Sequence, residues 1–208
     1  MNSPLFRAAL SILVLLLGVA RLHAADNLPD SLTGLKPQLP ETPFDYTVML
    51  PNHLAALAEY ATEPPGNPVT NAGATLGRVL FYDRGLSANG LVSCASCHSQ
   101  EVGFDDLNRF SIGFRGRITK RHSAGLAFAG YNSNGRYFRD EHAPTLEDQV
   151  LEPIHDPVEM GLEAGQLTAR VKARSWYNDL FLKAFDSPEI TENRIARALA
   201  QFVRSLVS

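Results

Sequence analysis

The chain has 208 residues, of which 45% are apolar, 20% charged and 9% aromatic, and its 19 Lys and Arg residues face 22 Asp and Glu residues. These are the proportions of an ordinary globular protein, and they exclude a disordered chain and a fibrous repeat. The formal net charge of -3 also argues against a nucleic acid as partner.

The N-terminal segment has the pattern of a secretory signal peptide. Arg7 is followed by thirteen uncharged, mostly apolar residues, and a small residue, Ala24, stands at the expected cleavage point. This apolar run is shorter than the about 20 residues that cross a bilayer, although a retained N-terminal anchor is the alternative. We therefore expect residues 1–24 to be a signal peptide and the mature protein to reside in the periplasm.

Residues 25–70 predict an extended N-terminal arm that precedes the folded unit. Five prolines lie between Ala25 and Pro51, which favours an extended segment wrapped over the domain. A short helix is expected over residues 53–60, and the run Pro-Pro-Gly-Asn-Pro at 64–68 then interrupts the chain. We expect the folded unit to comprise residues 71–208.

The folded unit predicts helices joined by long irregular segments. Apolar residues at helical spacing indicate a helix over residues 71–82. Residues 103–136 are rich in glycine and basic side chains and follow neither the helical nor the strand period, so we predict a long functional loop. Further helices are expected at 146–151, 167–173 and 177–185.

The last helix has the clearest amphipathic pattern. Thr191 fits the N-cap position, and one apolar stripe follows it, formed by Ile195, Ala198, Leu199, Phe202, Val203 and Leu206. No capping signal precedes Ser208. We therefore expect the helix to continue to Ser208 with an exposed stripe that favours association.

The two cysteines, Cys94 and Cys97, lie three positions apart with His98 directly behind them. A disulfide between them would close a very small loop and add little stability. A zinc site would need a second Cys/His pair at ligand spacing, and a thioredoxin-like dithiol would need a βαβ pattern around it. The motif Cys-Ala-Ser-Cys-His instead predicts one covalent haem c, held by two thioethers, with His98 as an iron ligand.

The group on the other face of the iron decides between electron transfer and catalysis. Electron carriers place a methionine or a second histidine there, whereas peroxide chemistry needs an open or displaceable position beside acid/base groups. The local sequence patterns do not single out one residue. The candidates are Met49, Met160, His53, His122, His142 and His155.

An ordered set of motifs extends from Leu76 to the end of the chain. The motifs are residues 76–83, 86–87, Val-Ser-Cys-Ala-Ser-Cys-His at 92–98, Arg-His-Ser at 121–123, Leu-Glu-Asp-Gln at 146–149, Asp-Pro-Val-Glu-Met-Gly at 156–161, and residues 198–206. Taken together, this set resembles the peroxidatic haem domain of bacterial di-haem cytochrome c peroxidases and their MauG relatives.

The resemblance implies an all-α, cytochrome c-like haem domain with long irregular loops. His98 would be the proximal iron ligand. Glu159 matches the family's distal glutamate, which would move a proton between the two oxygens of hydrogen peroxide. Gln149 matches the distal glutamine, which would orient the bound oxygens, and Met160 would be a packing residue beside the pocket.

The chain departs from the family pattern at three places. Arg139 stands where the family commonly has a tryptophan that bridges its two haems. His122 stands at the position of a calcium-binding asparagine and is a poor ligand for a cation that prefers oxygen, so calcium is not assigned. Because Cys94 and Cys97 are the only cysteines, the second, electron-delivering haem domain is absent from this sequence, and we expect either a fragment or a partner that supplies it.

Two functional hypotheses follow from these observations. The leading one is a cytochrome-c peroxidase type oxidoreductase that reduces hydrogen peroxide with electrons from a small cytochrome or copper protein, assisted by a second haem domain or a dimer partner. A MauG-like oxidation of a residue on a partner protein is a variant of it. The alternative is a mono-haem electron-transfer cytochrome with a six-coordinate iron.

Overall fold

The computed structural model describes residues 35–207 and is helical throughout its regular parts. Within these residues there is no strand, only three isolated β-bridges, which confirms the predicted all-α class. The predicted signal peptide, residues 1–24, lies outside the described residues. The α-helices are α3 (Asn71–Tyr82), α4 (Cys94–Cys97), α5 (Leu146–Gln149), α6 (Glu152–His155), α7 (Gln166–Lys172), α8 (Tyr177–Phe185) and α9 (Glu192–Arg204). The 3-10 helices are η2 (Asn52–Tyr60), η3 (Arg84–Leu86), η4 (Gln100–Val102) and η5 (Ala129–Tyr131).

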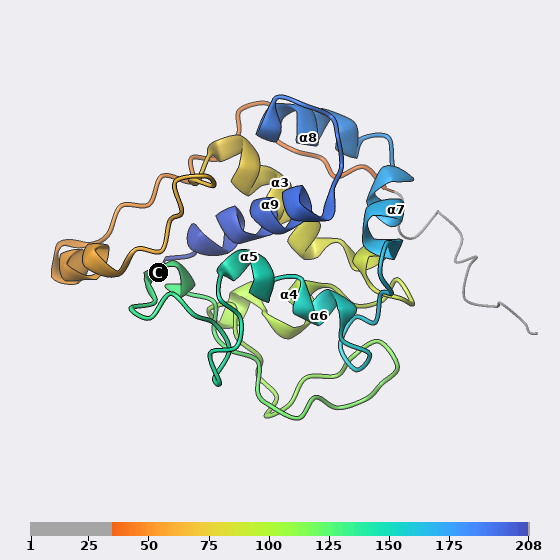
Figure 1. Cartoon of the computed structure of the whole chain (residues 1–208), viewed down its shortest axis with the longest axis horizontal. Helices are drawn as coiled ribbons and strands as arrows, with labels where there is room; N and C mark the ends of the chain where they lie inside the picture. Colours follow the sequence, from red (N-terminus) through yellow and green to blue (C-terminus); the bar gives the residue numbers. More distant parts are fainter. Residues whose placement is uncertain (1–34, 208) are drawn as a thin grey trace, which may run out of the picture.

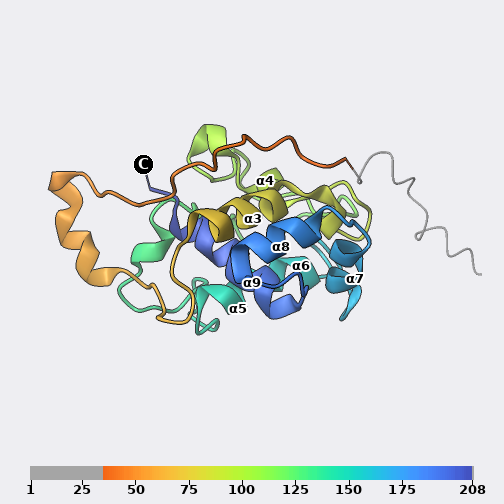
Figure 2. The same ribbon diagram turned by 90° about the horizontal axis from the view of Figure 1, so that it is seen from above.

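The core is built around α3 and α9, which lie against each other with α8 alongside (Figures 1 and 2). Each of the two central helices begins at a threonine cap. The Thr70 hydroxyl accepts a hydrogen bond from Gly73 N at 3.0 Å, and the Thr191 hydroxyl accepts one from Arg194 N at 3.2 Å. Nothing among residues 35–207 is a helix long and apolar enough to span a bilayer.

The last helix differs from its prediction at its C-terminal end. It stops at Arg204 instead of continuing to Ser208, because Ser205 closes the final turn: its backbone N–H donates to Gln201 O at 3.2 Å and its hydroxyl donates to Phe202 O at 2.6 Å. The apolar stripe is also buried, not exposed as expected. Packing against α3, α5 and η5 covers it, so the stripe is not a free surface for association.

The contact between α3 and α9 is close because Gly77 has no side chain. A Cβ atom at this position would lie 2.0 Å from the backbone oxygen of Ala198. We expect Gly77→Ala to lower the free energy of unfolding by about 1–3 kcal/mol, because the two helices must move apart. Urea unfolding of the haem-loaded protein measures the effect. Gly66→Ala is the matched control, since no atom lies within 4 Å of that position, and an equal loss in both variants would contradict the prediction.

The other predicted helices are present, with one difference. The structure places α7 and α8 where they were expected, but residues 146–151 do not form one helix. Helix α5 ends at Gln149, and a separate short helix, α6, begins at Glu152. Pro153, near the start of α6, lacks the N–H that would donate to the preceding turn of a continuous helix. The loop 103–136 is irregular apart from η5, as predicted.

Within the predicted arm 25–70, of which residues 35–70 are described, residues 35–51 are extended and run over α3 and α8 (Figure 2). Two contacts hold it there: the Tyr46 ring lies edge-on to Phe202 at 6.5 Å between centroids, and the Arg78 guanidinium lies 4.8 Å from the centre of the Phe44 ring. The short helix that follows is η2, which buries none of its residues. The arm is therefore a covering segment and not part of the core.

A polar network joins the end of the arm, at Thr62 and Asn67, to the last helix. Asn67 is buried, and its side-chain oxygen accepts a hydrogen bond from Gln201 Nε2 at 2.8 Å. Arg204 donates two hydrogen bonds of 2.8 Å to the carboxylate of Glu147, and its Nε donates to Thr62 O at 2.9 Å. These bonds attach the end of the arm and helix α5 to helix α9.

Candidate functional site

The Cys-Ala-Ser-Cys segment forms the single turn of helix α4. The turn begins where Ser93 N donates to Ser96 Oγ at 3.0 Å, and it closes where His98 N donates to Cys94 O at 3.0 Å. Both cysteines are free of disulfide bonds. The short helix brings Cys94, Cys97 and His98 to one cavity, whose apolar walls are Phe81, Val92, Leu126, Val150, Leu199 and Val203.

The segment in front of α4 is held by Arg170 of α7. The guanidinium donates hydrogen bonds to three carbonyl oxygens of this segment, those of Gly85, Ser87 and Ala88, the shortest at 2.9 Å to Ser87 O. The same turn contacts the far wall of the cavity, because Ala88 N donates to Met160 O at 2.7 Å. The two sides of the cavity are thus connected by backbone hydrogen bonds.

His98 presents one ring nitrogen to the cavity because the other is engaged. Its Nδ1 lies 3.2 Å from the carbonyl oxygen of Phe104. Phe104 has a left-handed backbone with φ 61°, and its ring packs against Phe81 and Phe202 at centroid distances of 6.0 and 6.2 Å. Burial lowers the pKa of His98, although the bond to Phe104 opposes this, so the neutral imidazole that binds iron is favoured.

Both cysteines are half-buried, and their thiols are held in the protonated form. Burial raises the pKa of Cys94 to about 12 and also raises the pKa of Cys97. A redox-active dithiol has a lowered pKa, so the thioredoxin-like interpretation is disfavoured. The apolar walls, the adjacent thiols and the oriented histidine fit a covalently bound haem c.

Glu159 lines the same cavity, and hydrogen bonds from two segments hold its backbone. Asp156 Oδ1 accepts hydrogen bonds from Val158 N at 2.6 Å and Glu159 N at 3.1 Å. Phe114 N, from the long loop, donates to Glu159 O at 2.9 Å. The carboxylate position is thus set by a turn and by a segment more than 40 residues away in sequence.

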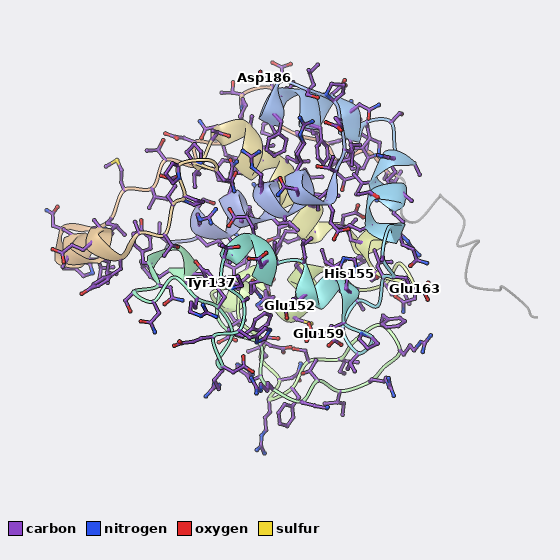
Figure 3. The ribbon with its side chains drawn as sticks, in the orientation of Figure 1. Tyr137, Glu152, His155, Glu159, Glu163 and Asp186 are labelled. Atoms are coloured by element: carbon purple, nitrogen blue, oxygen red, sulfur yellow. The ribbon has the colours of Figure 1, made fainter. Side chains whose placement is uncertain are left out.

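The pKa of Glu159 is raised above its usual value. Burial is the largest cause, followed by the negative charges of Asp156 and Glu152. Glu152, the first residue of α6, and Glu159 lie close together in the lower half of the molecule in the view of Figure 3. A carboxyl group with a raised pKa can both accept and return a proton closer to neutral pH.

Gln149 and Met160 also line the cavity, whereas the other distal candidates do not. Gln149 is the last residue of α5, and Met160 is buried with the core. Met49 is 83% exposed on the arm. The histidines are engaged or remote: His53 lies on η2, His122 pairs with Asp105, His142 pairs with Asp140 and Glu152, and His155 contacts Leu162 O and Glu192.

Three residues that line the cavity were not predicted from the sequence as site residues. Ser111, Thr119 and Ser123 come from the long loop and face the cavity. The Ser111 hydroxyl lies 2.6 Å from the Ser123 hydroxyl and donates to Asp106 Oδ2 at 2.6 Å. Hydroxyl residues in a glycine-rich loop carry no periodic signal, so only the folded backbone identifies them.

A second cluster beside the cavity joins His142 to two carboxylates. Its Nδ1 lies 2.6 Å from Asp140 Oδ1, its Nε2 lies 2.7 Å from Glu152 Oε2, and its ring stacks on Phe138 at 4.5 Å. These bonds, that to Glu152 first, raise the pKa of His142. The pairing therefore stabilises the fold fully below pH 6.5, the usual pKa of histidine, and this contribution is lost as pH rises through the raised value.

Glu152→Gln is expected to lower the pKa of His142 toward 6.5, because it removes the larger of the two causes. Titration of the His142 ring signals by NMR measures this shift. Glu163→Gln, an exposed carboxylate on another segment, is the control and is expected to leave the pKa of His142 unchanged. An unshifted His142 in the Glu152 variant would contradict the pairing.

Comparisons with known proteins identify the family of this chain. The sequence profile of the di-haem cytochrome c peroxidase family matches residues 71–208. The chain is 34% identical over 145 residues to the methylamine utilization protein MauG of Methylophilus methylotrophus, covering 70% of this chain and 43% of that protein. It is 34% identical over 135 residues to the cytochrome c551 peroxidase of Nitrosomonas europaea, covering 65% and 40%.

A solved structure gives the same relationship. The crystal structure of a MauG-like protein associated with microbial copper homeostasis superposes with a TM-score of 0.64 at 37% identity, covering 70% of this chain and 43% of that one. The chain thus spans less than half the length of these relatives. The matches confirm the resemblance of the ordered motifs to the di-haem cytochrome c peroxidase and MauG family.

Proposed function

Because the chain belongs to the di-haem cytochrome c peroxidase family, we propose that its cavity is a haem c oxidoreductase site that reduces hydrogen peroxide to water. The observation that carries this proposal is the convergence on one cavity of His98, the two thiols, Glu159 and Gln149. Neither an electron carrier nor a structural haem site requires a buried carboxyl with a raised pKa in that place.

Residues of α4 and its flank would hold the cofactor. Cys94 and Cys97 would form the thioethers, and His98 would bind the iron through Nε2, since its Nδ1 is engaged by Phe104. Residues 71–208 would form a cytochrome c-like domain around one haem c, with the arm 25–70 outside it. The haem, when bound, supplies the redox-active iron. The signal peptide 1–24 would place the protein in the periplasm.

Glu159 would carry the proton in the reaction. It removes a proton from one oxygen of hydrogen peroxide and delivers it to the other oxygen, which leaves as water. Gln149 would orient the two oxygens by hydrogen bonding. Complete reduction of one peroxide to two waters consumes two electrons and two protons.

The electrons would come from another redox centre, because Cys94 and Cys97 account for one haem c. A small cytochrome or a copper protein is the proposed donor, with a second haem domain or a dimer partner as a further contributor. A MauG-like reaction, in which a residue of a partner protein is oxidised, would use the same site.

One observation supports a second candidate, a mono-haem electron-transfer cytochrome. Met160 lines the same cavity, and its thioether would be the sixth iron ligand in such a protein. The two candidates differ in the ferric spectrum. The peroxidase proposal expects an open or displaceable sixth position and a reaction with one equivalent of peroxide.

The experiment uses the full chain loaded with haem by a maturation system. We expect its ferric spectrum to change on addition of equimolar peroxide, and we expect Met160→Ala to leave the spin state unchanged. A low-spin iron that ignores peroxide, and that becomes high-spin in Met160→Ala, would overturn the peroxidase proposal in favour of the electron-transfer cytochrome.

A further inference from the structure

Residues 109–121 of the long loop form a hairpin, called here the cationic hairpin. Gly113 N donates to Arg117 O at 2.8 Å, and Thr119 N donates to Ser111 O at 3.0 Å. Ile112 and Ile118 form an antiparallel bridge between these bonds. In Figure 1 this part of the chain projects from the lower edge, away from α3 and α9.

The hairpin has an inner and an outer face of different character. Ser111 is buried and Thr119 is half-buried, and both face the haem cavity. Ile112 and Ile118 are 60% and 64% exposed, so they form an apolar pair on the surface. Most of the apolar surface of these two isoleucines stays in contact with water, and its burial against another surface would be favourable.

The charges of the hairpin are all positive, although the chain as a whole is acidic. Residues 109–121 contain five Arg and Lys residues and no Asp or Glu, in a protein of net charge -3. Arg121 pairs with Asp140 at 3.3 Å, while Arg109 and Arg115 lie over the neighbouring Phe rings. Arg117 and Lys120 are exposed and have no partner among residues 35–207.

The hairpin is also a wall of the reactive cavity. Gly113 lies so close to Val158 O that a Cβ atom would be 1.6 Å from it, and Phe114 N donates to Glu159 O. A molecule bound to the outer face would therefore lie one layer of chain away from the cavity. This proximity suits the exchange of electrons between proteins, which requires close approach of the redox groups.

We propose that the outer face of the cationic hairpin docks an acidic protein surface with an apolar centre, and that this protein is a redox partner of the haem site. An apolar centre with a charged rim is the usual composition of a transient protein interface, and the rim charges set the partner and the association rate. The inference rests on the proposed function, since it names the partner that would supply the electrons.

The test uses the haem-loaded full chain and two probes, an acidic and a basic small c-type cytochrome. Titration calorimetry at low and high salt measures the dissociation constants. We expect the acidic cytochrome to bind and the basic one not to bind, with affinity falling steeply as salt increases. Arg117→Glu with Lys120→Glu is expected to weaken binding by about tenfold or more, because two rim attractions become repulsions.

The control reverses two exposed lysines on other helices, Lys172→Glu with Lys183→Glu, which changes the net charge by the same amount. This variant is expected to bind within about twofold of the parent. Arg117→Gln with Lys120→Gln should give an intermediate loss, and it replaces the charge reversal if that variant is unstable. Equal losses in control and hairpin variants, or no binding of the acidic cytochrome, would overturn the proposal.

Two further outcomes would also overturn it. Sedimentation of the free protein that shows self-association abolished by the hairpin variant would assign the surface to a second copy. Tighter binding to phosphatidylglycerol vesicles than to the acidic cytochrome would assign it to a membrane. The reaction of the haem-loaded parent protein with peroxide is measured in parallel without any cytochrome. If this reaction is absent, the proposed function is refuted, whatever the result for the docking surface.

Discussion

Glu159→Gln is expected to slow the cleavage of hydrogen peroxide by the haem-loaded protein by about 10²–10⁴-fold, the usual contribution of a positioned acid/base group. Glutamine has the size and polarity of glutamate but cannot accept and return a proton at the cavity. Stopped-flow absorption of the haem after mixing with peroxide measures the rate. Glu163→Gln, an exposed carboxylate, is the control, and an unchanged rate in Glu159→Gln would contradict the assigned role.

The pH dependence gives this prediction a second readout. A general base acts when deprotonated, so the rate of the parent protein should rise with pH through the pKa of Glu159, which lies above the usual range of a carboxyl group. This rise should be absent in Glu159→Gln. Because burial disfavours the charged carboxylate, the variant should also be more heat-stable than the parent at neutral pH.

Glu147→Ala is expected to lower the free energy of unfolding by about 3–5 kcal/mol, the cost of leaving a buried charge without its partner. The side chains of Arg204 and Glu147 are only 5% and 16% exposed, and their two hydrogen bonds hold α5 against α9. Urea unfolding of the haem-loaded protein measures the loss. Glu163→Ala should change stability by less than about 0.5 kcal/mol, and a loss of similar size in both variants would refute the prediction.

A double replacement separates the charge from the packing. Glu147→Leu combined with Arg204→Met removes both charges and should be less destabilised than Glu147→Ala. The pH dependence has a defined sign. Burial acts to raise the pKa of Glu147, but hydrogen bonds from Arg204 and Asn67 outweigh it and lower the pKa below 4.5. The stabilisation is present above pH 4.5 and is lost as pH falls through the lowered value.

The helices that the sequence predicted well are those with a strong apolar period. The segment 177–185 is helical over its predicted length, and Thr191 caps α9 as expected. The predicted C-terminal end of α9 was wrong because the observed end depends on Ser205 and on contacts of Arg204 with distant residues. No local sequence pattern contains these contacts. The burial of the apolar stripe likewise depends on α3, more than 100 residues earlier.

The candidate site was predictable to different degrees. The haem motif could be found because its three residues lie within five consecutive positions of the sequence. Glu159 and Gln149 were identified only through the resemblance, and the structure places them in the same cavity, although their roles stay predictions. Asn67 and Gln201, 134 positions apart, could not be paired from sequence, because two separate polar residues show no spacing that links them.

The packing of α3 on α9 has a consequence for the order of folding events. The two helices are separated by more than 100 residues, so the main native contact closes a long loop and forms late compared with local helical turns. Cys94 and Cys97 lie inside that loop. The thiols are therefore accessible during folding until α9 reaches α3, and a haem could be attached in this period before the core closes around it.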